Sequence, residues 1–67
     1  MLKVGDKITL TNEAIENYGE EYQNREFTIT HIAFNENEHM GYDNSLDGMA
    51  LYDLSEFDFS VYDYEIN

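Results

Sequence analysis

The sequence predicts a small, mostly β domain, and three observations support this expectation. Hydrophobic residues alternate with polar ones over several short stretches, as they do in strands with one buried face. Ten of the 67 residues are aromatic, so even a short chain has large side chains from which to build a core. The chain contains no proline to interrupt these stretches. We expect a single domain over residues 1–67, since a chain of this length matches one small folding unit.

The first predicted elements are a strand and a short helix. Residues 3–11 predict a turn followed by a half-buried strand. Asn12 is expected to cap a helix over residues 13–18, because an Asn side chain can accept a hydrogen bond from the first turn. Gly19 is expected to end it, since glycine tolerates the backbone that follows a helix.

The clearest strand runs from residue 26 to residue 34. Its apolar positions change from odd to even numbers between Ile29 and Ile32, near His31. One extra residue in a strand resets the alternation of its side chains. The pattern therefore predicts a β-bulge or a sharp bend near His31.

Two further strands complete the predicted fold. A long polar connection over residues 35–48 leads to a strand at 49–54 and, after a short break, to a strand at 57–66 whose apolar face also switches. Four to five short, bent strands favour an SH3-like barrel, because closure removes exposed sheet edges. A small α+β domain, with one helix on a strand meander, is the second choice.

Charge is the most unusual property of the sequence. Fifteen acidic residues face three basic ones, which gives a formal net charge of −12. The basic residues are Lys3, Lys7 and Arg25, so residues 26–67 contain ten acids and neither Lys nor Arg. This surface disfavours direct binding to nucleic acids or anionic membranes and favours a basic protein partner. The alternative is that the charge serves only solubility and keeps the chain monomeric.

The sequence favours the cytoplasm. Residues 1–3 lead directly into a polar stretch without the apolar segment of a signal peptide, and no apolar run approaches a membrane span. The absence of cysteine fits a reducing compartment.

Several segments carry a resemblance to known proteins. The opening Lys3-Val4-Gly5-Asp6-Lys7-Ile8 resembles the start of many SH3-like barrel domains. A longer pattern resembles small uncharacterised acidic proteins carried by phages and prophages of Gram-positive bacteria. Its segments are Leu10–Ala14, Tyr18–Tyr22, Phe27–His31, His39–Asp43, Leu51–Leu54 and Phe59–Glu65. The resemblance implies a bacterial host cytoplasm and an accessory phage role, and it assigns no catalytic residues.

Acids and tyrosines of the C-terminal half are the candidate partner-binding residues. The acids could form a spaced anionic array, since same-face neighbours on a strand stand roughly 6.6 Å apart. Tyrosine is favoured at the centres of interfaces and could supply anchors. The alternative is a solvated acidic face and tyrosines that belong to the core. The candidates are Asp43, Asp47, Asp53, Glu56, Asp58, Asp63, Glu65, Tyr42, Tyr52, Tyr62 and Tyr64.

Two functional hypotheses follow from these features. The first is a non-catalytic phage-type protein that binds a basic partner, in its narrower form a nucleic-acid mimic that inhibits a host or defence factor. The mimic form predicts carboxylates gathered on one face. The second is a structural or accessory phage component, which predicts self-association or an exposed apolar patch. We do not expect an enzyme, because no nucleophile motif or phosphate loop is present.

No cofactor or metal is expected, although one loop has a weak calcium signature. Asp43, Ser45 and Asp47, followed by Gly48, match the first half of an EF-hand loop, but Leu54 occupies the position of the bidentate Glu. An Asx-rich turn explains the same residues. A transition-metal site would need both histidines together with Glu36, Glu38 or Asp43. The alternative places His31 in a strand and His39 in an exposed loop.

Overall fold

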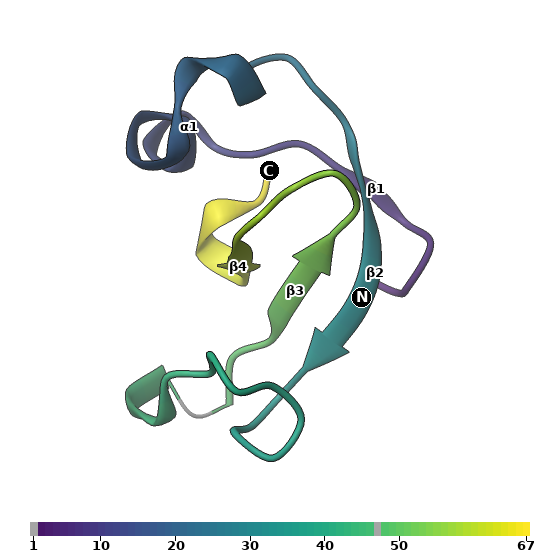
Figure 1. The fold of residues 1–67 in the computed structure, drawn as a ribbon, viewed down its shortest axis with the longest axis vertical. Helices are drawn as coiled ribbons and strands as arrows, with labels where there is room; N and C mark the ends of the chain where they lie inside the picture. Colours follow the sequence, from purple (N-terminus) through teal and green to yellow (C-terminus); the bar gives the residue numbers. More distant parts are fainter. Residues whose placement is uncertain (1, 47) are drawn as a thin grey trace.

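Four short strands follow one another in the sheet in chain order, and each is antiparallel to the next (Figure 1). In the computed structural model, which describes residues 2–46 and 48–67, this sheet curls into a half-barrel beside one helix. The structure is therefore a small α+β domain, and the expected β-rich sheet with a single short helix is confirmed in this form. The elements are β1 (Lys7–Ile8), α1 (Asn12–Tyr18), β2 (Phe27–Ala33), β3 (Leu51–Leu54) and β4 (Ser60–Tyr62).

The helix α1 begins one residue earlier than the sequence predicted. Thr11, with extended backbone, is the N-cap, and its hydroxyl accepts the Ala14 N–H at 3.2 Å. Asn12 is already helical, so its predicted capping role is wrong. Gly19 ends the helix as expected, with a φ of 133° that a residue bearing a Cβ rarely adopts. Among the described residues, no helix is long and apolar enough to cross a membrane.

The long strand β2 contains the predicted irregularity. Ile29 lies opposite Leu54, but the next paired residue, His31, lies opposite Asp53, so Thr30 is left over. The extra residue lets both Ile29 and Ile32 reach the main core although their positions differ in parity. The bulge expected near His31 is confirmed.

The fourth strand is much shorter than expected. β4 ends at Tyr62, and Asp63–Glu65 forms a 3₁₀ turn. The Glu65 carboxylate reaches back to accept the Tyr62 N–H at 3.1 Å, which stabilises the turn in place of strand pairing. The prediction of a continuous strand over residues 57–66 is therefore wrong.

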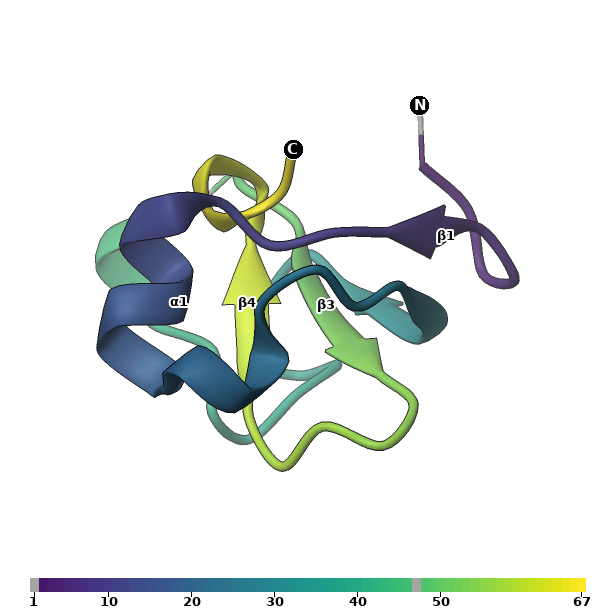
Figure 2. The same cartoon turned by 90° about the horizontal axis from the view of Figure 1, so that it is seen from above.

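The two ends of the curled sheet meet through the segments that follow β1 and β4. Leu10 pairs with Ile66 in an antiparallel bridge. On either side of it, the Thr11 N–H donates to the Glu65 carbonyl and the Asn67 N–H to the Thr9 carbonyl, both at 3.0 Å. Figure 2 shows the chain after β1 passing beside the C-terminal turn. The bridge reduces the exposed edge of a short sheet.

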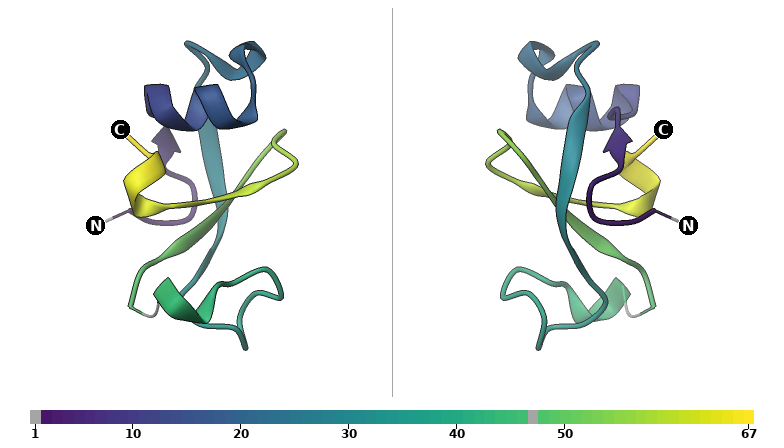
Figure 3. Two further views of the ribbon diagram at one scale, coloured as in Figure 1. Left: turned by 90° about the vertical axis from the view of Figure 1, so that its left-hand side faces the viewer. Right: turned by 90° about the vertical axis from the view of Figure 1, so that its right-hand side faces the viewer.

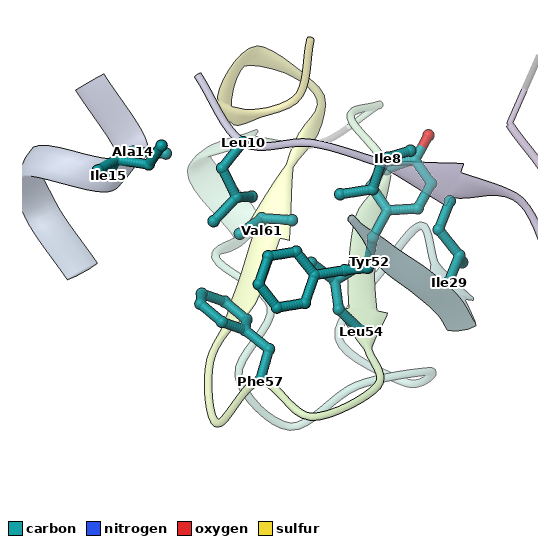
Figure 4. Close-up of a cluster of buried hydrophobic side chains, with 11 residues drawn as sticks. Ile8, Leu10, Ala14, Ile15, Ile29, Tyr52, Leu54, Phe57 and Val61 are labelled. Carbon is teal, nitrogen blue, oxygen red and sulfur yellow. The ribbon is translucent and has the colours of Figure 1, made fainter. Parts of the chain in front are cut away.

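Buried side chains form one main core and one small cluster. The main core fills the inside of the curl, where strand residues meet α1 and the ring of Phe57 (Figure 4). The small cluster contains Ala33, Tyr42 and Leu51. It lies under the loop that connects β2 to β3, and it holds this loop against the sheet.

Candidate interaction surface

The structure separates the four candidate tyrosines into two buried and two more exposed ones. Tyr42 and Tyr52 belong to the core, with exposed fractions of 6% and 5%. Tyr62 is half-buried, whereas Tyr64 is 61% exposed. Only the last two are placed to contact a partner, so Tyr42 and Tyr52 are corrected from surface anchors to core residues.

Three tyrosines form a continuous row of ring contacts, which we call the tyrosine row. Tyr42 meets Tyr62 edge to face, with ring centroids 5.8 Å apart. Tyr62 in turn stacks on Tyr64 at 6.1 Å with an interplanar angle of 8°. The row therefore runs from a buried ring to an exposed one. Because its inner end is fixed in the small cluster, the exposed ring is held on a rigid support.

Asp43 lies at the middle ring of the tyrosine row. Its N–H donates to the Tyr62 hydroxyl at 2.8 Å. Its carboxylate accepts hydrogen bonds from the side chain and the N–H of Ser45, which lower the pKa of Asp43. The pKa of Tyr64 is raised by desolvation and then by nearby Glu65, Tyr62 and Asp43. The carboxylate of Asp43 therefore contributes to the negative field at the exposed end of the tyrosine row.

The remaining candidate acids do not form the expected array along a strand. Asp53 is half-buried among polar side chains, and Glu56 pairs with Arg25 at 3.9 Å. Asp58 and Asp63 are exposed, but a 3₁₀ turn replaces the strand on which Asp63 was expected. The spacing of roughly 6.6 Å between same-face strand residues therefore does not apply to these acids. Asp47 lies outside the described residues.

Glu65 is buried rather than exposed, with an exposed fraction of 8%. The Tyr18 hydroxyl donates to its carboxylate at 2.8 Å, and the Tyr62 N–H donates to the same side chain. Burial, the hydrogen bond to Glu65 and its charge raise the pKa of Tyr18. Glu65 therefore ties α1 to the C-terminal turn and is corrected from a partner-binding residue to an internal one.

Exposed carboxylates occur at both ends of the longest axis of the molecule. Glu13 and Glu16 lie on α1 at one end, and Glu36 and Asp43 lie in the β2–β3 connection at the other (Figures 1 and 3). The exposed carboxylates are therefore spread along the length of the molecule rather than gathered at one end.

A cluster that the sequence did not predict joins His39, Asp53 and Ser60. The His39 Nε2 lies 3.0 Å from the Asp53 carboxylate and 3.1 Å from the Ser60 hydroxyl, which also donates to Asp53. The Gly41 N–H donates to the His39 Nδ1 at 2.9 Å. A neutral ring that accepts at Nδ1 carries its proton on Nε2 and donates it to Asp53.

The hydrogen bonds in this cluster differ from those of a catalytic triad. In a triad, the serine hydroxyl donates to one ring nitrogen while the carboxylate holds the other. Here Ser60 and Asp53 share one nitrogen, and Ser60 donates to Asp53, so the ring takes no proton from the hydroxyl. The cluster instead fastens the β2–β3 connection to the sheet. The prediction that His39 is an exposed loop residue is wrong, because its side chain is only 23% exposed and contacts the Asp53 carboxylate.

The described part of the chain contains no group of three His, Asp or Glu side chains that could hold a metal ion. The Nε2 of His31 lies 3.2 Å from the Glu38 carbonyl oxygen, while His39 contacts Asp53, so the two rings have separate partners. Asp43 and Ser45 bond one another in an Asx turn, and the third calcium candidate, Asp47, is outside the described residues.

The buried hydroxyl of Tyr52 predicts a loss of stability in alkali. Burial, a hydrogen bond to Asp63 and the charge of Asp63 raise the pKa of Tyr52 to about 12. Below pH 10 the group is protonated in both states. Above pH 10 the unfolded chain loses this proton first, so the free energy of unfolding falls between pH 10 and about 12, by up to about 1.4 kcal/mol per pH unit.

Urea unfolding at about pH 9 and about pH 11 measures this effect. A Tyr52→Phe variant has no proton to lose at this position, so its decline should be shallower. An equally steep decline in the variant would contradict the assignment.

Comparison with known proteins adds no relative. The chain matches no family model, no curated protein and no solved structure.

Proposed function

We propose that this chain is a non-catalytic interaction protein that binds a basic protein partner. One observation carries the proposal. The exposed ring of Tyr64 is stacked on Tyr62, whose hydroxyl accepts a hydrogen bond from the N–H of Asp43, in a part of the sequence that contains no Lys or Arg. An aromatic face next to a carboxylate suits a cationic side chain, because both attract positive charge.

The row supports binding in a second way. A tyrosine side chain has few rotatable bonds, and here it is already supported by a stacked neighbour. The Tyr64 side chain therefore loses little conformational freedom when a partner binds, which lowers the entropic cost of binding. The net charge of −12 adds long-range attraction, which raises the association rate with a basic protein.

The narrower form of the proposal is a nucleic-acid mimic that inhibits a host or defence factor. The molecule is 31 Å long and the chain carries fifteen carboxylates. A DNA duplex of that length carries about 18 phosphate charges. The formal net charge of −12 is about two thirds of that number. This charge over a similar length supports the mimic form.

The resemblance to phage and prophage proteins supplies the proposed setting, a bacterial host cytoplasm. We also propose that the half-barrel is a variant of the SH3-like barrel. The bridge between Leu10 and Ile66 supports this, since it joins the first and last parts of the curled sheet.

A self-associating phage component is the alternative function. It needs a contiguous apolar surface. The exposed large hydrophobic side chains come from separate parts of the chain, namely Val4, Phe34, Met40, Phe59 and Tyr64. This observation favours the monomeric binding protein over the alternative.

The test is affinity capture from a Gram-positive lysate at low and high salt, with captured proteins identified by mass spectrometry. We expect basic, nucleic-acid-binding proteins to be retained at low salt, released at high salt and displaced by added duplex DNA if the mimic form is correct.

The variants Tyr64→Ala and Asp43→Asn should reduce capture. Glu16→Gln on α1 is the control, since it removes the same charge as Asp43→Asn at a distant exposed position. Retention that is indifferent to salt, or equal capture by Tyr64→Ala, would overturn the proposal. A solution mass that rises with concentration would favour the self-associating component.

A further inference from the structure

A cleft of about 420 Å³ opens where β2 ends and β3 begins. Its volume lies in the range of pockets that hold small ligands or single side chains. We call it the Phe34 cleft. It is lined by Leu2, Phe34, Gly48, Ala50, Tyr52 and Asp63.

Part of the cleft lining is apolar. Phe34 follows β2 and is 48% exposed, although it is a large hydrophobic residue. Leu2 is only partly buried against the main core, and Ala50 continues the apolar lining. An occupant with a hydrocarbon stem would cover this surface and gain the free energy of apolar burial.

The lining of the cleft also carries a negative charge. Asp63 accepts a hydrogen bond from the hydroxyl of Tyr52 and a long one, 3.4 Å, from the Ala50 N–H. These two contacts place the carboxylate beside Ala50 and the hydroxyl of Tyr52. Figure 4 shows the Tyr52 hydroxyl directed out of the main core. The carboxylate is therefore a positioned acceptor beside an apolar wall.

Asp63 has no cationic partner in the described part of the chain. The ion pairs there are Arg25 with Glu56 and His39 with Asp53. An ionised carboxylate has about four acceptor sites, so the two donors leave capacity for another. The charge in the cleft is thus compensated by neither a lysine nor an arginine of the protein itself.

These features together select one class of occupant. A neutral apolar ligand would cover the carboxylate without pairing it, which is costly. An anionic ligand would meet Asp63 and the net charge of −12. A lysine or arginine side chain suits both parts of the lining, because its alkyl stem can cover apolar side chains while its charge pairs with Asp63.

We infer that the Phe34 cleft receives a lysine or arginine side chain of the basic partner. This inference rests on the proposed function and deepens it, because it adds a second contact point to the tyrosine row. The partner then presents at least two basic side chains, one at each point.

The test is an NMR titration of the ¹⁵N-labelled protein with N-acetyl-oligoarginine and N-acetyl-oligolysine amides, with oligocitrulline as the neutral control. We expect shifts at Phe34, Gly48 and Ala50 with the cationic peptides and none with oligocitrulline. The two cationic peptides distinguish arginine from lysine as the preferred occupant.

Two variants and two matched controls complete the design. Asp63→Asn and Phe34→Ala should each weaken peptide binding by about tenfold or abolish shifts in the cleft. Asp58→Asn removes the same charge and Phe59→Ala the same ring at exposed positions outside the cleft, so both should stay within about twofold of the wild type. Melting curves of all four verify that they remain folded.

The possible failures are distinguishable. If the peptides bind but shift only Tyr64 and its neighbours, or if Asp63→Asn behaves like Asp58→Asn, the cleft is not the receptor while the proposed function stands. If neither peptide binds, the inference is overturned, and the lysate experiment decides the proposed function separately.

Discussion

A Phe57→Ala variant is expected to lose about 3–5 kcal/mol of its free energy of unfolding. Phe57 is 9% exposed, and its ring meets Tyr18 at 5.3 Å, Tyr22 at 4.9 Å and Phe27 at 5.4 Å between centroids. Phe57 lies in the β3–β4 connection and therefore packs this connection against three elements, namely β2, α1 and the turn that follows α1. A domain of this length has a total stability of roughly 3–10 kcal/mol, so this one truncation removes a large share of it.

Urea unfolding followed by circular dichroism measures the loss. Phe59→Ala is the matched control. It removes the same kind of ring two positions further along the chain, where the side chain is 51% exposed. We expect the control to lose about 1 kcal/mol or less. Equal losses in the two variants would contradict the central position of Phe57 in the core.

A Glu65→Ala variant is expected to lose about 3 kcal/mol, although it lowers the net negative charge. The truncation removes the acceptor for the Tyr18 hydroxyl and the Tyr62 N–H. Both donors lie in partly buried surroundings, where an unpaired polar group is costly. The loss should also loosen the bridge between Leu10 and Ile66, which is next to Glu65 in the chain.

Hydrogen exchange at the Thr11 amide, which donates to the Glu65 carbonyl, reports on that bridge and should become faster. Glu65→Gln keeps one acceptor oxygen and should fall between the wild type and Glu65→Ala. Asp58→Ala is the control, because it removes the same charge from an exposed side chain and relieves self-repulsion. A Glu65→Ala variant as stable as Asp58→Ala would show that the buried carboxylate is not a structural tie.

Local patterns in the sequence were sufficient for the features that depend on neighbouring residues. Gly19 marked the end of α1, because the backbone there requires a positive φ. The change of parity between Ile29 and Ile32 located the bulge in β2, because strand side chains alternate strictly unless a residue is inserted. The predicted N-cap differed from the observed one by one residue, because the side chains of Thr11 and Asn12 can both accept the capping hydrogen bond. Only the path of the chain out of β1 selects between them.

The candidate site depended more strongly on contacts between distant residues. Asp63 and Glu65 were expected on one strand face, but the Tyr18 hydroxyl, 47 positions from Glu65, draws that carboxylate inward. Likewise, nothing near His39 indicates that it meets Asp53 and Ser60 across the sheet. Sequence spacing carries no information about such pairs, because the intervening loop can place them at any separation.

The sequence by itself determined the charge imbalance, the β-rich composition and the local breaks and bends, since each follows from which residues are neighbours in the chain. Only the tertiary structure decided which tyrosines face solvent, which acids are buried and where a cleft forms. These properties arise when the sheet curls and its ends meet at Leu10 and Ile66, and the free energy of that closure is shared among contacts far apart in the chain.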